Sequence, residues 1–262
     1  MMQSLYIGST GMLGMQTQID TTANNIANVN TIGFKKSRAE FADLMYKTME
    51  YAGTSTSDTT KSPTGIEVGL GVRPTAINKI FTEGNLKQTD NQLDMAVTGR
   101  GFFKVELPDG TEAYTKNGAF KIDENGSIVN SDGYKLIPEV VIPADATNVT
   151  IGVDGIVTVT QPGQTTATQI GQINLTNFIN PAGLHSTGDN LYLETDSSGQ
   201  PVEGTPGVDG LGTIRQGFVE LSNVQLVVEL TDLITGQRAY DSSSKIITTS
   251  DEMLQTVNGL KR

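Results

Sequence analysis

Apolar side chains recur at every seventh position in the last stretch of the chain, from about Gly217 to Leu260. An α-helix makes one turn in about 3.6 residues, so such a repeat places these side chains in one narrow stripe. The pattern predicts a C-terminal helix of about forty residues, which is long for a globular domain and so requires a packing partner. This apolar stripe consists of Val219, Leu226, Leu233, Tyr240, Ile247 and Leu254.

The first thirty residues carry a matching repeat. Gly8, Gly11 and Gly14 indicate close approach of another backbone, because glycine otherwise costs about 1 kcal/mol in a helix interior. Between residues 3 and 29 the one charged side chain is Asp20, and uncharged amides and hydroxyls suit a face that meets protein. The repeat consists of Leu5, Met12, Ile19 and Ile26. We therefore predict two long terminal helices that pair as a coiled-coil-like core domain.

The segment after this helix changes in character twice. Gly33 is expected to end the helix, because glycine readily adopts the left-handed conformation found at helix ends. Residues 34–50 are compatible with a short second helix or with an extended chain. Residues 51–65 are rich in Thr, Ser and Gly, which is typical of a linker or a long exposed loop.

Between Ile66 and Arg215 the apolar period changes from seven residues to two, which is typical of β-strands. Turn dipeptides interrupt this region at the spacing of hairpins. They include Asp109-Gly110, Asn117-Gly118, Asn125-Gly126, Asp132-Gly133 and Asp154-Gly155. The sequence thus predicts an α+β protein with one or two β-rich outer domains. The expected parts are a helical core domain (1–50 and 216–262), an extended loop (51–70), a first β-rich domain (71–140 and 190–215) and a second one (141–189).

Motifs for catalysis or cofactor binding are weak. The pairs Gly69-x-Gly71 and Gly99-x-Gly101 lack the third glycine and the following helix of a dinucleotide site. The segment from Asp123 to Gly126 resembles a calcium loop in composition, but its glycine falls at the fourth position instead of the sixth. A hairpin turn is the better interpretation of that segment.

Composition narrows the function further. Cysteine is absent, which excludes disulfides and thiolate zinc sites, and His185 is the single histidine. A net charge of −11 argues against binding to the phosphates of nucleic acids. With 29 carboxylates, the sequence does not exclude a catalytic pair of the kind that glycosidases use. The chain has no Trp, however, that could stack on a sugar. We expect no enzyme activity, cofactor or metal, and an interaction surface instead.

The first residues, MMQSLYIGSTG, contain no basic side chain, and no apolar run has the length needed to span a bilayer. We therefore expect neither a conventional secretory signal nor a membrane span. This evidence fits a cytosolic protein and an export route without a cleaved signal equally well.

Three ordered motifs give the chain a family resemblance. They are Ala23–Thr31 with Gly33-Phe34-Lys35, then Leu93–Val97 with Gly99-x-Gly101-Phe102-Phe103, and finally Gly217–Glu220 and Ser222–Val224 with Gln237–Tyr240. With these motifs the chain resembles the flagellar rod and hook family of bacterial axial proteins. It departs from the usual family pattern at Ile32, where proline is common, and after Tyr240, where relatives more often carry Glu and Asn.

The resemblance implies a structural subunit that polymerises helically into the distal rod, the drive shaft that carries motor torque across the periplasm to the hook. The loop from Tyr51 to Arg73 and the chain length favour the distal rod, and a proximal-rod or hook-type subunit stays open. Implied partners are other copies of the chain, proximal rod subunits, hook or hook-junction subunits, the P and L ring proteins and the flagellar export apparatus. The implied location is the flagellar basal body, reached without a cleaved signal peptide.

Two sets of residues are expected to act in assembly. The terminal helices would nest between copies as the inner wall of a tube, and the loop would brace neighbouring subunits. The expected subunit interface consists of Leu5, Met12, Ile19, Asn24, Asn25, Ile26, Asn28, Leu226, Leu233, Tyr240, Ile247 and Leu254. The expected rod-stiffening loop is marked by Tyr51, Thr54, Pro63 and Arg73.

Two other functions stay open on the sequence. One is a secreted oligomeric β adhesin, which binding of the monomer to a glycan array would favour. The other is a peptidoglycan hydrolase associated with the rod, which turnover of murein sacculi would favour. Filament growth at high concentration would favour the rod subunit.

Overall fold

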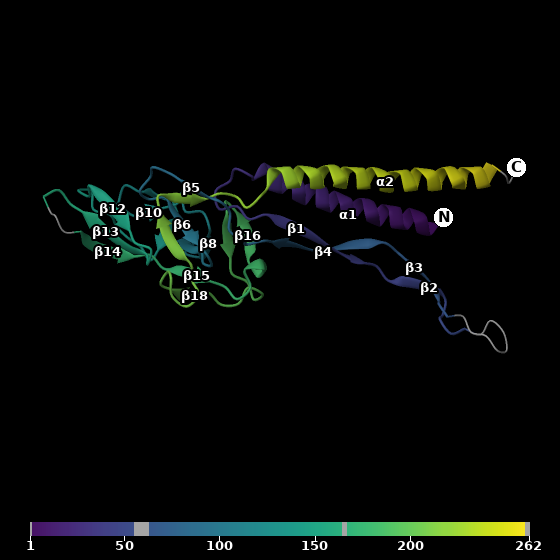
Figure 1. Ribbon diagram of the computed structural model, residues 1–262, viewed down its shortest axis with the longest axis horizontal. Helices are drawn as coiled ribbons and strands as arrows, with labels where there is room; N and C mark the ends of the chain where they lie inside the picture. Colours follow the sequence, from purple (N-terminus) through teal and green to yellow (C-terminus); the bar gives the residue numbers. More distant parts are fainter. Residues whose placement is uncertain (1, 55–62, 164–166, 260–262) are drawn as a thin grey trace. The chain divides into compact units, whose positions relative to one another are not determined.

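The computed structural model describes residues 2–54, 63–163 and 167–259. Two long terminal helices enclose a β-rich middle in the chain order, as predicted for an α+β protein (Figure 1). The chain forms two compact units. The helical unit contains Met1–Ala27, Ser37–Asn78 and Gln225–Arg262, and the β unit contains Asn28–Lys36 and Lys79–Val224. The division of the chain into four parts stays a prediction.

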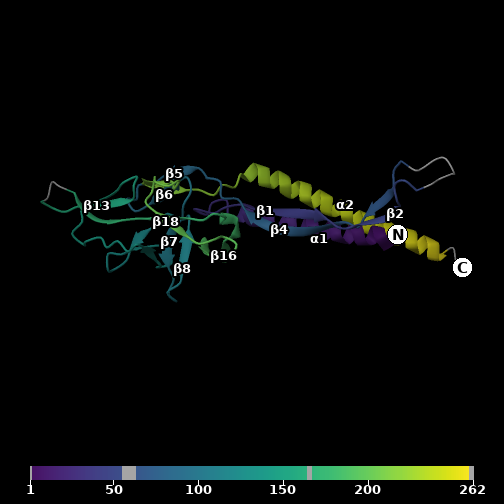
Figure 2. The same cartoon turned by 90° about the horizontal axis from the view of Figure 1, so that it is seen from below.

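The helical unit is built on α1 (Met2–Ala27) and α2 (Leu226–Gly259), which lie side by side in both views (Figure 1, Figure 2). α1 covers nearly the whole predicted N-terminal helix. The prediction that the second helix starts near Gly217 is wrong, because α2 begins at Leu226. Val219 instead lies in strand β20 (Phe218–Glu220), where it is 2% exposed and pairs with Lys87.

A β-ribbon completes the helical unit. Its strands are β1 (Ser37–Asp43), β2 (Tyr46–Glu50), β3 (Ile66–Gly69) and β4 (Val72–Lys79). β1 pairs with β4, and β2 pairs antiparallel with β3. Residues 37–43 and 46–50 are therefore strands and not a second helix, and the loop expected over 51–70 contains β3.

The ribbon packs against α1 at glycine. A Cβ added at Gly14 would lie 3.4 Å from Val72 Cγ1 and 3.6 Å from Phe41 Cε1, so the absent side chain makes room for the ribbon. Phe41, Met45 and Met49 are spaced four residues apart, which is why the sequence left a helix open for this segment. Met45 and Met49 are 83% and 67% exposed in the ribbon.

The β unit holds the remaining strands in several small sheets. One sheet has seven strands in the order β16-β17-β8-β7-β11-β10-β9, and another has the order β12-β13-β14. Pairs join β15 with β18, β6 with β19, and β5 with β20. The bounds are β5 (Leu86–Gln88), β6 (Met95–Thr98), β7 (Phe103–Glu106), β8 (Glu112–Thr115), β9 (Lys121–Ile122), β10 (Ile128–Val129), β11 (Lys135–Ile137), β12 (Asn148–Ile151), β13 (Ile156–Thr160), β14 (Thr168–Gln172), β15 (Leu175–Asn177), the 3-10 helix η1 (Pro181–Gly183), β16 (His185–Gly188), β17 (Leu191–Leu193), β18 (Val202–Gly204) and β19 (Thr213–Gln216).

Four of the five predicted turn dipeptides form left-handed turns in the β unit. Gly110, Gly126, Gly133 and Gly155 have φ values between 79° and 88°, which glycine adopts without strain. Gly118 differs, because a Cβ added there would lie 1.5 Å from the carbonyl oxygen of Met95. Glycine at position 118 therefore permits two backbones to approach and does not serve a hairpin turn.

Gly33 has a φ of 71°, which confirms the left-handed conformation predicted after α1. A Cβ at this position would also lie 2.7 Å from the backbone nitrogen of Asn117. We expect Gly33→Ala to lower the free energy of unfolding of the β unit by about 2 to 3 kcal/mol, measured by urea denaturation. Gly110→Ala is the matched control, since φ is 79° and nothing lies within 4 Å of the added Cβ. Equal losses in the two variants would contradict the steric argument.

Candidate functional site

The contact between α1 and α2 runs along almost the whole of α1. Residues with higher numbers in α1 contact residues with lower numbers in α2, so the two helices are antiparallel. The contacts pair Asn25 with Glu229, Ile19 with Gly236, Gly11 with Ser243, Gly8 with Ile247 and Ser4 with Ser250. Gly8 and Gly11, two of the three glycines expected to admit another backbone, thus face α2, whereas Gly14 faces the ribbon.

A row of small and polar residues in α2 lies deepest in this contact. Glu229, Gly236, Ser243 and Ser250 are spaced seven apart, and Glu229 and Ser250 are 5% and 1% exposed. A Cβ at Gly236 would lie 3.2 Å from Ile19 Cγ1, so an added side chain would push the helices apart. Apolar periodicity could not find this row, but a seven-residue repeat of small residues beside the apolar one was a usable signal.

The predicted apolar stripe lies at the edge of the helix contact. Leu226 and Tyr240 are 44% and 37% exposed, and Leu233, Ile247 and Leu254 are half-buried. On α1, the four predicted apolar residues are half-buried as well: Leu5, Met12, Ile19 and Ile26. Within the chain, these nine side chains therefore keep part of their apolar surface in solvent.

Asn25 is committed to contacts inside the chain, which the expected interface role did not foresee. Its amide donates to the Ser37 carbonyl at 2.8 Å and to Glu229 Oε2 at 3.0 Å, and its Oδ1 accepts from the Ser37 nitrogen at 2.9 Å. Asn25 is 2% exposed, whereas Asn24 is exposed and Asn28 is half-buried. Asn25 thus ties α1 to both α2 and the ribbon.

The outward surfaces of α1 and α2 carry many exposed apolar side chains. Monomeric soluble proteins rarely expose large contiguous apolar patches, and such patches mark interaction sites. The exposed residues include Tyr6, Leu13, Val227, Val228, Leu230, Ile234, Ile246, Met253 and Val257, which are between 42% and 77% exposed. These apolar side chains stay exposed even though α1 and α2 already pack on each other. Such a surface is suited to packing against further helices.

The ribbon shows the same property. Tyr51 is 75% exposed, and Thr54, Pro63 and Arg73 are also exposed. The residues between Thr54 and Pro63, 55–62, lie outside the described residues, so the expected stiffening loop is described only at its two ends. The exposed apolar side chains of the ribbon are Met45, Tyr46, Met49, Tyr51, Ile66 and Ile77.

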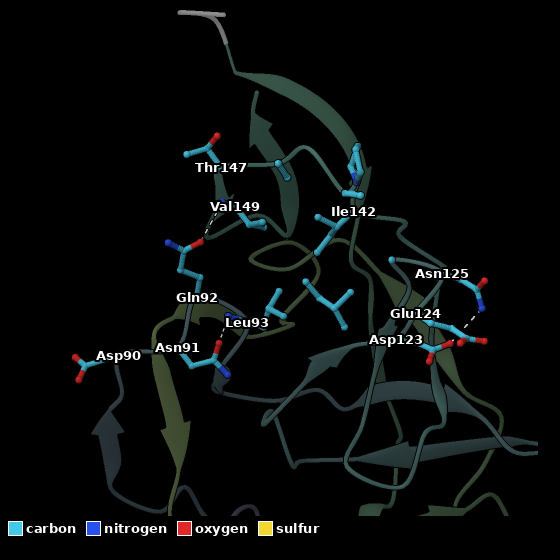
Figure 3. A pocket seen from close by; sticks show the side chains of 15 residues that line it. Asp90, Asn91, Gln92, Leu93, Asp123, Glu124, Asn125, Ile142, Thr147 and Val149 are labelled. Carbon is cyan, nitrogen blue, oxygen red and sulfur yellow. Dashed lines mark hydrogen bonds between the residues drawn. The ribbon is translucent and has the colours of Figure 1, made fainter. Parts of the chain in front are cut away.

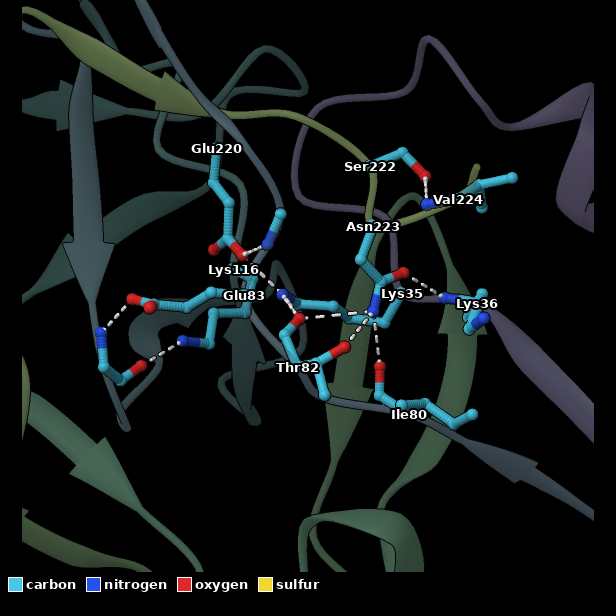
Figure 4. A network of polar contacts seen from close by, with 12 residues as sticks. Lys35, Lys36, Ile80, Thr82, Glu83, Lys116, Glu220, Ser222, Asn223 and Val224 are labelled. Atoms are coloured by element: carbon cyan, nitrogen blue, oxygen red, sulfur yellow. Dashed lines mark hydrogen bonds and ion pairs between the residues drawn. The ribbon is translucent and has the colours of Figure 1, made fainter. Parts of the chain in front are cut away.

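The first and third sequence motifs meet in the β unit (Figure 4). Lys35 Nζ lies 2.5 Å from Glu220 Oε1 and donates to the Thr82 carbonyl at 2.7 Å, and neither ionic side chain is more than 1% exposed. Asn223 accepts from the Lys36 nitrogen at 2.8 Å and donates to the carbonyl of Ile80 at 2.8 Å. The segment that follows α1 and the segment that precedes α2 are thereby held together within the β unit.

No catalytic arrangement emerges in the described part of the chain. A cavity of about 600 Å³ lies in the β unit (Figure 3). Among its polar side chains, Gln92 accepts from the Val149 nitrogen, and Asn125 donates to Asp123. The Gly126 nitrogen donates to the Asp123 carbonyl at 2.9 Å, which confirms a hairpin turn between β9 and β10. No cluster of metal-binding side chains occurs among the described residues.

The position of the histidine and the apolarity of the helices complete the description of the site. His185 lies exposed in strand β16. Among the described helices, none combines the length and apolarity that crossing a bilayer requires.

Comparison with known proteins covers both terminal helices and the β unit. Residues 5–35 match the family described as "Flagella basal body rod protein", residues 96–159 match "Flagellar hook protein FlgE/F/G D1 domain", and residues 215–260 match "Flagellar basal body rod FlgEFG protein C-terminal". The first and third ranges contain the first and third sequence motifs, and the range 96–159 contains the second motif from Ala96 onward.

Whole-chain relatives agree with these matches. Flagellar basal-body rod protein FlgG of Buchnera aphidicola subsp. Schizaphis graminum is 51% identical over 99% of this chain and 100% of its own. The proteins of the same name from Borreliella burgdorferi and Bacillus subtilis are 46% and 41% identical, each over 100% of both chains. A crystal structure of Helicobacter pylori flagellar hook protein FlgE2 aligns with 71% of this chain and 43% of its own at a TM-score of 0.25 and 16% identity, which is too low to bear on the fold.

Proposed function

The chain belongs to the flagellar basal-body rod protein family and is a structural subunit of the distal rod, not an enzyme, and on this premise we propose how it assembles. In the proposed rod, the α1–α2 pairs of many copies nest against each other as a coiled-coil-like inner wall. Residues 5, 12, 19 and 26 of α1 and residues 226, 233, 240, 247 and 254 of α2 would meet side chains of neighbouring copies.

The observation that carries this proposal is the exposed apolar surface on both helices. Leu230 and Ile234 are 42% and 52% exposed, on the same helix whose Leu233 is half-buried. Burying a Leu or Ile side chain is worth roughly 1.5 to 3 kcal/mol, so a neighbour that covered a few of them would offset the cost of association. The contacts are head-to-tail and do not close on themselves, which produces an open helical polymer.

Torque transmission follows from the same arrangement. A shaft carries torque when its subunits resist sliding, and closely nested helices resist it because their side chains interlock. Inside each subunit the two helices pack closely, since a Cβ added at Gly8 would lie 3.0 Å from Ile247 Cγ1. The proposed rod is thus stiff within the subunit and between subunits.

A direct test is polymerisation of the purified full-length chain. We expect sedimentation to show a critical concentration, above which negative-stain electron microscopy shows helical tubes. A chain that stays monomeric at all accessible concentrations would contradict the assembly proposal. Binding of that monomer to a glycan array would then favour the adhesin alternative.

We expect the ribbon and its loop to stiffen the rod by bracing neighbouring copies. Deletion of residues 55–62 between Thr54 and Pro63 should leave polymerisation intact and shorten the persistence length of the tubes in electron micrographs by about twofold or more. The matched control is deletion of residues 164–166, between strands β13 and β14 of the β unit. Unchanged bending in the first deletion would count against the bracing role.

The position of the rod supplies further partners. The rod lies in the basal body, with other rod subunits and hook subunits as neighbours along its axis. We propose that it also turns inside the P and L rings and that the chain reaches it through the flagellar export apparatus without a cleaved signal peptide.

A further inference from the structure

A second cavity of the β unit has the chemistry of an anion site. Its volume is about 350 Å³. Phe81, Phe102 and Phe178 give it aromatic walls, and Arg100 and Lys116 give it two cationic side chains. Arg100 is exposed, while Lys116 is 3% exposed and so lies at the bottom of the cavity. The aromatic walls lower the local dielectric and strengthen any charge interaction made there.

Lys116 is a buried cation that has no ion-pair partner in the described part of the chain. Its Nζ donates to the Gly99 carbonyl at 3.0 Å and lies 5.5 Å from the centroid of the Phe102 ring. Among the described residues, no carboxylate lies within 4.0 Å of this nitrogen, unlike the other deeply buried lysines, Lys35 and Lys104. A buried charge normally has such a partner, because burial without one is costly.

The nearest acidic groups are engaged elsewhere. Glu83 accepts from the Gly99 nitrogen, so Glu83 and Lys116 hold the two sides of Gly99 (Figure 4). Glu220 is paired with Lys35. Both carboxylates act on Lys116 only at longer range, and the Lys35 cation opposes them. Burial is the largest effect and lowers the pKa of Lys116 to about 8.

We propose that this cavity is a contact site between copies of the chain, in which Lys116 receives the carboxylate of an Asp or Glu side chain from a second copy. This inference rests on the proposed function, since it assigns one contact of the same polymer. Lys116 would supply a charge-assisted hydrogen bond at the bottom of the cavity, and Arg100 would attract the incoming carboxylate from the rim.

Two features favour a second copy over a free small acid. The chain has 29 acidic and 18 basic residues, so each copy carries an excess of carboxylates, and α2 alone exposes Asp232, Asp241 and Asp251. The rim also carries Ile179, which is 87% exposed and has the apolar character of a surface that another protein covers.

The test compares the critical concentration of the full-length chain at pH 7 and pH 9. The contact requires protonated Lys116, so the wild-type value should rise about tenfold between the two pH values. Lys116→Met removes the cation at similar length and should raise the value at pH 7 by about tenfold or more, with little further change at pH 9. Lys116→Arg keeps the charge at both pH values and should keep the low value at pH 9.

Lys121→Met is the matched control, because Lys121 is exposed in β9 and loses the same charge. It should behave as wild type at both pH values. Thermal unfolding of each monomer shows whether the β unit remains folded, and if Lys116→Met unfolds it, the pH profiles of wild type and Lys116→Arg decide.

The outcomes separate the two proposals. If wild type polymerises with the same critical concentration at pH 7 and pH 9, and folded Lys116→Met matches it, the carboxylate site is overturned and the assembly proposal stands. Benzoate that binds the monomer through Lys116 while assembly stays unchanged in Lys116→Met also overturns it, since the occupant is then a free acid. If wild type forms no polymer under any condition, both proposals fail.

Discussion

Ile247→Asp is expected to block polymerisation at concentrations where the wild type assembles and to leave the β unit folded. Ile247 lies against Gly8 of α1 at the edge of the helix contact, so an aspartate there would place a carboxylate between two closely approaching backbones. The lost burial alone is worth roughly 1.5 to 3 kcal/mol, which corresponds to a rise in critical concentration of about tenfold to a hundredfold. Leu233→Asp, about four turns nearer the start of α2, should act in the same direction. Sedimentation measures the effect.

Controls at the same position and elsewhere separate assembly from folding. Ile247→Leu keeps the apolar volume and should polymerise as wild type does. Asn125→Asp adds the same charge at an exposed turn of the β unit and should have no effect. If Ile247→Asp forms normal tubes at the wild-type concentration, the assignment of the helix pair to the inner wall is wrong.

Lys35→Met is expected to lower the free energy of unfolding of the β unit by about 3 to 5 kcal/mol. The substitution leaves Glu220 as a buried charge, and removing one partner of a buried ion pair has an effect of this size. Glu220 would keep its bond from the Gly84 nitrogen, which is 2.8 Å from Oε1. Urea denaturation followed by far-ultraviolet circular dichroism measures the loss.

A double-mutant cycle tests this explanation. Adding Glu220→Gln to Lys35→Met removes the unpaired charge but keeps an acceptor for Gly84, so the double variant should be more stable than Lys35→Met alone. Lys135→Met is the control, because the Lys135–Glu139 pair is 46% and 49% exposed and should contribute less than about 1 kcal/mol. A double variant less stable than Lys35→Met would mean that the lysine acts through packing and not through its charge.

The helices were predictable from the sequence because their repeat is long. α1 ends at Ala27, close to the predicted end, and α2 contains five of the six residues of the apolar stripe. The prediction that Val219 belongs to this helix was nevertheless wrong, since spacing alone cannot distinguish the first turn of a helix from a preceding strand. Pairing of β20 with β5, a contact between segments far apart in sequence, decides that question.

Other parts of the site could not be predicted from the pattern of apolar residues. Glu229, Gly236 and Ser250 are the buried residues of α2, yet none of them is apolar, so a search for hydrophobic periodicity passes over them. The Lys35–Glu220 ion pair joins residues that are 185 positions apart, and one sequence contains no signal for such a pairing. The turns of the β unit were predictable because Asp-Gly and Asn-Gly require only local geometry.

The central claim is that the terminal helices of separate copies cover one another's exposed apolar side chains. A cryo-electron microscopy map of tubes grown from the purified chain tests it most directly. We predict α1 and α2 of each copy on the inner wall, with Leu230 and Ile234 buried against helices of neighbours. Tubes in which these helices face solvent, joined only through their β units, would contradict the account.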